Sequence, residues 1–214
     1  MLSALTFAFE CELCQHLIMT KPSYHHGDLA NALIDAALKA VEQEGEAAVS
    51  LRDLAQTLGV SRAAPYRHFE DRDALLAAVA AKGFEALNAR YAAALETRGD
   101  GRAKLAAAQG AFFDFAYEKP GLYRLMFESD LLGRPNPPQV LIPPADLSYR
   151  LLLRAVAGAH PEADEAQVKR LTLLMMATGH GFLALDRAGR IKPFMIEPMT
   201  REELLKALVS GAIG

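Results

Sequence analysis

Apolar residues recur at spacings of three and four along most of the chain, which is the period of an amphipathic helix. The pattern predicts a first helix from Asp28, which can cap it, to Gly45. A second helix follows the capping residue Ser50 and ends at Gly59, since a residue without a Cβ turns the chain at low cost. A third, shorter helix is expected behind Ser61. Because Ala and Leu are abundant and β-branched residues are few, we expect an all-α protein.

The same period continues through the rest of the chain and predicts six more helices. Asp71 can cap the first of them, and Thr200 can form a capping box with Glu203 at the start of the last. Five prolines between residues 130 and 145 predict the one long loop. The expected helical ranges are 71–97, 102–117, 122–128, 146–157, 162–187 and a last helix from residue 200.

Residues 50–69 combine two short helices with a tight glycine turn, and this is the pattern of a helix-turn-helix unit. The second helix of such a unit fits the major groove of DNA. Pro65 would be the fourth residue of that helix, where it removes only the first intrahelical hydrogen bond. The same pattern also fits a helical hairpin inside an ordinary helical domain.

The second helix carries cations, hydrogen-bonding aromatic residues and small residues that permit close approach to bases. Arg62 is expected to contact a base, because Arg most often pairs with O6 and N7 of guanine. Tyr66, His68 and Arg72 are expected to hold phosphates, whereas Arg67 suits either role. The predicted DNA-binding residues are Ser50, Ser61, Arg62, Ala63, Ala64, Tyr66, Arg67, His68 and Arg72.

A longer motif surrounds this unit. The run L-A-x-x-L-G-V-S at residues 54–61 is followed by Tyr66, His68, Phe69 and a basic residue. Together with an opening Y-H-H-G-D-L, these positions make residues 24–76 resemble the DNA-binding domain of TetR-family transcriptional regulators. The resemblance implies an N-terminal three-helix helix-turn-helix domain, followed by a C-terminal helical domain that binds an effector and forms a homodimer.

Two positions depart from the family pattern, and a further motif indicates one subgroup. Pro65 stands where an aliphatic residue is more usual, and Arg72 stands where Lys is commoner. A cation in the first turn of a helix opposes the helix dipole, and a bound phosphate would reverse that effect. The segment Thr178–Leu183, T-G-H-G-F-L, resembles the His-Gly signature that one subgroup carries in its C-terminal domain.

These observations divide the chain into a helix-turn-helix domain over residues 21–70 and an effector-binding and dimerisation domain over residues 71–214. Residues 1–20 are expected to be an N-terminal extension without function. Cys11 and Cys14 lie in that extension, but nothing nearby supplies the fourth ligand of a zinc site. We therefore expect no metal.

Charge alone argues against a nucleic-acid partner. The net charge is −3, and residues 19–73 hold six cations against nine anions. The cations cluster around the two short helices, however, so we expect weak and salt-sensitive non-specific DNA binding. Residues 1–9 are apolar but too short to span a bilayer, and they lack the basic start of a signal peptide. The chain is therefore expected to be cytoplasmic, with no membrane partner.

The C-terminal half holds more aromatic and methionine side chains than a dimer interface needs, and mobile Met residues suit an adaptable apolar pocket. An ordinary core would also use these side chains, and His180 would then be a satisfied interior histidine. The expected effector-binding residues are Phe112, Phe115, Met126, Phe127, Met175 and His180. The expected dimer-interface residues are Ala177, Gly181, Leu204, Leu208 and Val209, with Gly179 also permitting close helix packing.

No enzyme and no cofactor are expected, since the sequence contains no G-x-S-x-G, P-loop or G-x-G-x-x-G motif. The resemblance implies a repressor that binds a palindromic double-stranded DNA operator as a homodimer. A small apolar or amphipathic effector would release it by favouring a different arrangement of the helix over 71–97. The alternative is an architectural DNA-binding protein that has the same helix-turn-helix unit and no effector.

Overall fold

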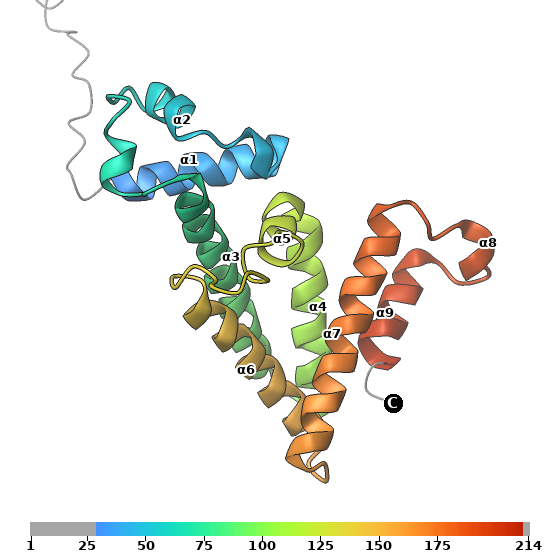
Figure 1. Ribbon diagram of the computed structural model, residues 1–214. Coiled ribbons are helices and arrows are strands. Elements are labelled where there is room, and N and C mark those ends of the chain that lie inside the picture. Colours follow the sequence, from blue (N-terminus) through green and yellow to red (C-terminus); the bar gives the residue numbers. More distant parts are fainter. Residues whose placement is uncertain (1–28, 212–214) are drawn as a thin grey trace, which may run out of the picture.

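The computed structural model describes residues 29–211 (Figure 1). This part of the chain consists of nine α-helices and two 3-10 helices, and it contains no strand. The expectation of an all-α protein is confirmed. The predictions for Asp28, for Cys11 and Cys14 and for the N-terminal extension lie outside the described residues.

The first two α-helices follow the sequence predictions. α1 (Leu29–Glu44) buries one face and ends at Gly45, whose φ of 90° lies in the region that favours glycine. α2 (Leu51–Thr57) is capped by Ser50, whose hydroxyl accepts a hydrogen bond at 3.4 Å from the backbone N–H three residues later. The chain then turns at Gly59, where φ is 67°.

The expected third helix is not an α-helix. Residues 62–63 form a turn, and the 3-10 helix η3 (Pro65–Arg67) follows it. Pro65 has no N–H to donate to the carbonyl of Ser61, so the α-helical ladder cannot begin there. The N–H of Ala64 donates to that carbonyl instead, at 2.9 Å. The prediction that Ser61 caps a helix is therefore wrong, since no side chain caps η3.

α3 (Arg72–Leu95) is the central helix of the fold. Asp71 caps it as predicted, accepting a hydrogen bond at 2.7 Å from the N–H of Ala74. α1, α4, α5 and α6 all pack against α3, and it therefore buries residues on several faces along its length. The helix runs from the N-terminal helices to the far end of the bundle, so both halves of the chain share it (Figure 1).

The prolines of the predicted loop lie partly inside a helix. Pro143 and Pro144 occupy the first turn of α6, where backbone N–H groups have no intrahelical partner and prolines are tolerated. α6 thus begins at residue 142 rather than 146, and α5 begins at Pro120 for the same reason. The short helix α8 was not predicted. The remaining helices are α4 (Gly101–Glu118), α5 (Pro120–Phe127), α6 (Ile142–Ala159), α7 (Glu165–Arg187), α8 (Pro193–Ile196) and α9 (Arg201–Gly211).

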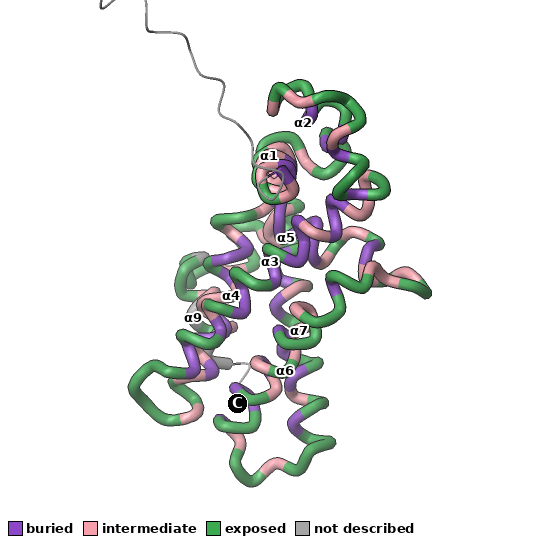
Figure 2. The backbone as a smooth tube through the Cα atoms, turned by 90° about the vertical axis from the view of Figure 1, so that its left-hand side faces the viewer, coloured by how far each residue is buried: buried purple, intermediate pink, exposed green. Residues whose placement is uncertain are grey.

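α4 and α6 pack against each other and against α3, while α7 covers α6 and α9 contacts α4. α5 crosses the upper end of this bundle and contacts α1, α3 and α4. Buried positions gather where these helices meet, and the outer turns around α2 are largely exposed (Figure 2). None of the described helices is both long and apolar enough to cross a membrane.

Two glycines let helix ends meet backbone to backbone. A Cβ on Gly101 would lie 1.7 Å from the carbonyl oxygen of Gly158, so α4 begins directly against the last turn of α6. A Cβ on Gly121 would lie 2.3 Å from the carbonyl oxygen of Val41, so α5 begins directly against the last turn of α1. Any larger side chain at either position would force the two helices apart.

Candidate DNA-binding surface and effector cavity

Most residues predicted to bind DNA lie together on one exposed surface between α2 and α3. This DNA-binding surface comprises Ser61, Arg62, Ala63, Tyr66, Arg67 and His68. Tyr66 is 56% exposed, which is high for a large aromatic residue. Among the described residues, the cationic and aromatic side chains of this surface have no hydrogen-bond or ion-pair partner. Their polar groups are therefore free to contact another molecule.

The same segment is anchored from below by apolar residues. Pro65 and Phe69 are buried, and Ala64 packs partly buried against the core. The three residues between these anchors, Tyr66, Arg67 and His68, are all exposed, so their polar side chains face outward. Ser50 is half-buried and its hydroxyl is engaged in the α2 cap. Ala64 and Ser50 thus support the surface from within the fold, and their contact with DNA stays a prediction.

Arg72 has a structural role that the sequence did not reveal. Its Nε donates a hydrogen bond at 3.0 Å to the carbonyl of Val49, and its Nη2 donates to the carbonyl of Glu46. These carbonyls flank the 3-10 helix η2 (Glu46–Ala48), which precedes α2. The guanidinium also lies 3.6 Å from the carboxylate of Asp73. Arg72 therefore ties the start of α3 to the segment that leads into α2, and a phosphate contact stays a prediction.

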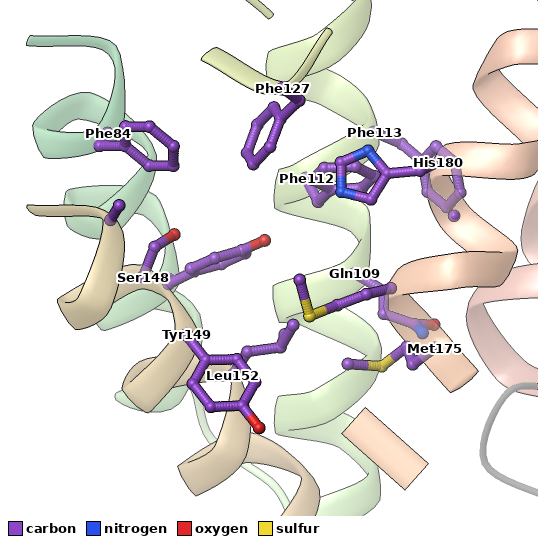
Figure 3. Close-up of a pocket in the computed structure, with 14 residues that line it drawn as sticks. Phe84, Gln109, Phe112, Phe113, Phe127, Ser148, Tyr149, Leu152, Met175 and His180 are labelled. Carbon is purple, nitrogen blue, oxygen red and sulfur yellow. The ribbon is translucent and has the colours of Figure 1, made fainter. Parts of the chain in front are cut away.

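A cavity opens among α3, α4, α6 and α7, with α5 at one side (Figure 3). Its volume is about 80 Å³, which is room for several water molecules or a small guest. Four of the six residues predicted to bind an effector line it, namely Phe112, Phe127, Met175 and His180. Phe115 and Met126 do not. The ring of Phe115 packs 5.5 Å from the guanidinium carbon of Arg90, and Met126 packs against Gly83.

His180 lies at the centre of an aromatic cluster on one wall of the cavity. Its ring centroid is 4.8 Å from that of Phe127 and 5.0 Å from that of Phe112. Its Nδ1 is 2.6 Å from the hydroxyl oxygen of Tyr123, so the imidazole is hydrogen-bonded as well as lining the cavity. Burial lowers the pKa of His180 below its ordinary value, and the nearby Arg187 cation lowers it further. Both effects favour the neutral form of the imidazole.

Arg187 fastens the end of α7 to α4 and α5. Its guanidinium carbon lies 4.1 Å from the ring centroid of Tyr123, and its Nη2 donates to the carbonyl of Ala116 at 2.7 Å. Burial and the carboxylate of Glu128 raise the pKa of Tyr123 to about 12, although Arg187 opposes them. Tyr123 thus keeps its proton, and the His180–Tyr123 pair is neutral as a whole.

α5 connects this cavity to α1. Phe127 of α5 lines the cavity, and Tyr123 of α5 bonds to His180. At the other end of α5, the carboxylate of Glu42 accepts hydrogen bonds from the backbone N–H groups of Gly121 at 3.2 Å and Leu122 at 2.8 Å. A carboxylate at a helix N-terminus is favoured by the helix dipole. We call the contact between Glu42 and these two N–H groups the α1–α5 joint.

α7 carries an exposed apolar stripe on the side opposite the cavity. Leu173, Leu174 and Leu185 are 64%, 57% and 47% exposed, and the predicted interface residues Ala177 and Gly181 lie between them. These spacings place all five on one face of the helix. We call them the α7 stripe. Exposed apolar patches of this kind are typical of protein–protein interfaces, so the α7 stripe is the candidate dimer interface.

The other predicted interface residues have different surroundings. Gly179 faces the cavity, where a Cβ would lie 3.2 Å from the ring of Phe112, so it serves packing within the chain. Leu204 and Leu208 of α9 are half-buried against the chain's own core. The side chain of Val209 lies outside the described residues.

Sequence reasoning missed four polar residues of the cavity, which are Tyr91, Gln109, Ser148 and Tyr149. They come from α3, α4 and α6, and only the packing of these helices brings them together. The available signal was a polar residue within an otherwise apolar helical face, as at Gln109 among the alanines and phenylalanines of α4.

Comparison with known proteins gives two family matches that follow one another along the chain. Residues 33–79 match the model of the bacterial regulatory proteins of the tetR family. Residues 105–211, half of the chain, match the model of the tetracyclin repressor-like C-terminal domain. The first match covers the helix-turn-helix unit, and the second covers α4, α6 and α7, which surround the cavity together with α3.

Individual relatives agree with these matches. A structure of a protein with unknown function from Rhodococcus sp. RHA1 is 32% identical, with a TM-score of 0.73, over 90% of this chain and 95% of that one. The TetR family transcriptional regulator PfmR from Thermus thermophilus shares the fold at 22% identity, with a TM-score of 0.60, over 85% and 96% of the two chains.

The HTH-type transcriptional activator FasR of Mycolicibacterium smegmatis is 35% identical over 104 residues, which are 49% of this chain and 48% of that protein. The chain thus spans about half the length of this curated relative. The family model over residues 105–211 and the Rhodococcus relative each extend far beyond the helix-turn-helix unit. On these matches the chain belongs to the TetR family of bacterial regulatory proteins.

Proposed function

We propose that this protein is a DNA-binding transcriptional repressor that acts in the cytoplasm and is released from its operator by a small apolar or amphipathic effector. The observation that carries the proposal is the position of the cavity behind α5, whose first turn is held by Glu42 of α1. Phe127 and His180 are part of the cavity lining, and both are coupled to α5, since Phe127 belongs to it and His180 bonds to Tyr123. The architectural alternative offers no reason for such a cavity.

DNA recognition needs two copies of the helix-turn-helix unit. A two-fold homodimer matches a palindromic operator, with its two reading elements about 34 Å apart. The α7 stripe supports such a dimer, because it is apolar, exposed and continuous along the helix. Membership of the subgroup with a His-Gly signature stays a prediction, and the place of His180 in the cavity wall is consistent with it.

Two connections can carry the effector signal. α3 contributes Phe84 and Tyr91 to the cavity and holds the segment before α2 through Arg72. α5 reaches α1 through the α1–α5 joint. An effector that prefers a displaced α3 or α5 would shift the two reading elements out of register with the operator and so lower the affinity for DNA. By thermodynamic linkage, bound DNA would lower the affinity for the effector by the same factor.

The α1–α5 joint can be tested without knowing the effector. Glu42→Gln keeps an acceptor oxygen but removes the charge, and hydrogen bonds to a charged acceptor are about twice as strong as neutral ones. We expect amide hydrogen exchange at the start of α5 to accelerate about fivefold, equivalent to about 1 kcal/mol. Glu44→Gln is the matched control, because Glu44 is exposed at the end of the same helix. Equal exchange in both variants would show that the joint does not hold α5.

The function as a whole is tested by fluorescence anisotropy on DNA from upstream of the protein's own gene, against scrambled DNA, over a salt series. We expect binding of two protomers per duplex that survives salt at which the scrambled control is released. Equal and steeply salt-dependent binding to both DNAs would favour the architectural alternative.

Two substitutions on the DNA-binding surface separate base recognition from phosphate contact. Arg62→Ala is expected to reduce discrimination between operator and mutated operator by about 1–3 kcal/mol. Tyr66→Phe removes one hydroxyl and should lower the affinity for all DNA sequences by the same factor. Anisotropy titrations on operators altered base by base measure both effects. A sequence-selective loss in Tyr66→Phe would overturn the assignment of Tyr66 to the phosphates.

The direction of control needs its own measurement, because the relative FasR is described as an activator. Transcription of the neighbouring genes in cells that lack this protein provides it. A rise in transcription supports repression, whereas a fall would identify an activator.

A further inference from the structure

The wall of the cavity carries no charge. None of the described residues that line it is Lys, Arg, Asp or Glu. The imidazole of His180 is neutral, because burial lowers its pKa. Moving an ionised group from water into such surroundings is strongly unfavourable unless a counter-charge meets it. The cavity therefore selects against anions and cations.

The cavity nevertheless holds polar groups that lack partners. Gln109, Tyr91 and Ser148 line it and are only 7%, 5% and 8% exposed. The Oε1 atom of Gln109 is buried with no hydrogen-bond partner in the described part of the chain. The hydroxyls of Tyr91 and Ser148 likewise form no hydrogen bond there. Buried polar atoms are normally satisfied, so the Gln109 oxygen in particular calls for a donor from a bound molecule.

Aromatic rings make up much of the remaining wall (Figure 3). The rings of Phe84 and Phe127 lie edge to face at 5.2 Å between centroids, and those of Phe112 and Phe113 do so at 5.5 Å. Such clusters extend readily to a further ring, because aromatic edges and faces attract each other electrostatically. Met175 and Met176 complete the wall with flexible thioethers that adapt to the shape of a guest.

We propose that the effector of this protein is an uncharged aromatic molecule that bears a hydroxyl group. Its ring system lies against the phenylalanines and methionines, and its hydroxyl bonds to Gln109, Tyr91 or Ser148. A hydroxyl both donates and accepts, so it satisfies the amide of Gln109 in either orientation. The effect of this ligand on operator binding rests on the proposed function, whereas its binding to the cavity is measured without DNA.

Three probes with the same ring system separate the contributions of the ring, the hydroxyl and a charge to the binding affinity. They are naphthalene, 2-naphthol and 2-naphthoate. The chain contains no Trp, so the emission of naphthalene-type probes is not overlapped by indole fluorescence. At pH 7 we expect 2-naphthol to bind the full chain most tightly. Naphthalene should bind about tenfold more weakly, since it leaves the polar groups unsatisfied. 2-Naphthoate should bind at least about a hundredfold more weakly than 2-naphthol, because its charge finds no partner.

Tyr91→Phe locates the binding site. This variant loses only a hydroxyl that has no described partner, so its thermal unfolding midpoint should match the wild type. We expect 2-naphthol affinity to fall about fivefold while naphthalene affinity stays unchanged, and naphthalene is thus the internal control. Gln109→Met keeps the length of the side chain and removes its amide. It should likewise reduce the ratio of the affinity for 2-naphthol to the affinity for naphthalene.

Each outcome decides one question. Equal affinity for naphthalene and 2-naphthol, or tightest binding of 2-naphthoate, would overturn the proposed ligand class while leaving release by another effector possible. Absence of binding by all three probes would overturn the cavity as the aromatic receptor. If 2-naphthol binds as expected but leaves operator affinity unchanged, the proposed ligand class is supported. The proposed function is then contradicted on one point, because ligands of this class do not release the protein from DNA.

Discussion

Replacement of Gly101 by alanine is expected to destabilise the protein by about 3 kcal/mol or more. The new Cβ would lie 1.7 Å from the carbonyl oxygen of Gly158 and 2.2 Å from its carbonyl carbon. Both are backbone atoms of α6, so no side chain can rotate away to make room. The start of α4 must therefore move off the end of α6, and the contact between these two helices forms a large part of the C-terminal core.

Gly110→Ala is the matched control for this prediction. Gly110 lies within the same helix, and a Cβ there meets nothing within 4 Å. Alanine should stabilise the protein at that position by about 0.5–1 kcal/mol, because it restricts the unfolded chain and favours a helix. Urea unfolding at one fixed protein concentration measures both variants. An unfolding free energy for Gly101→Ala equal to that of the wild type would show that the helix ends separate at little cost.

Leu174→Arg is expected to abolish the homodimer and to lower operator affinity about 10²–10⁴-fold. Leu174 is 57% exposed near the N-terminal end of the α7 stripe, and a two-fold interface would place the new charge against apolar surface of the partner subunit. In a dimer, once one subunit binds its half-site, the other binds the second half-site as an intramolecular step, which raises the operator affinity. A monomer lacks this increase in affinity. Sedimentation measures the dimer, and anisotropy on the operator measures the affinity.

Leu147→Arg is the control for this substitution. Leu147 is an exposed leucine of α6, 43% exposed and outside the α7 stripe. The same change there should leave both the dimer and the operator affinity intact. A dimer that survives Leu174→Arg, or dissociates equally in both variants, would contradict the assignment of the α7 stripe as the interface.

Helix limits that depend on residues three positions apart were predictable from the sequence. Ser50 and Asp71 cap their helices as expected. The capping box of Thr200 and Glu203 is also formed, with backbone-to-side-chain distances of 2.7 Å and 3.1 Å. These bonds are local, so the sequence contains all the information that they require.

Features that depend on longer distances were predicted less well. Pro143 and Pro144 look like loop residues, yet they start α6, because a proline is harmful only beyond the first turn. Pro65 had the opposite effect and kept the second element of the helix-turn-helix unit from becoming an α-helix.

The cavity shows the same limit. Phe115 and Met126 were predicted to line it from residue type alone, but the rotation of α4 and α5 turns them elsewhere in the core. Tyr91, Gln109, Ser148 and Tyr149 were missed, because only tertiary packing brings three separate helices around one space. Residue type identified the aromatic character of the wall, whereas its hydrogen-bonding groups required the assembled structure.

The α1–α5 joint has a consequence for how such a protein can change over evolutionary time. Glu42 bonds to backbone N–H groups, which every residue except proline supplies, so the joint recognises a helix end rather than particular side chains. Of the two residues that donate to Glu42, Gly121 is the one whose backbone packs directly against α1. The side chains of α5 that face the cavity can therefore diverge while its attachment to α1 persists, and new chemical signals can be acquired without redesign of the operator.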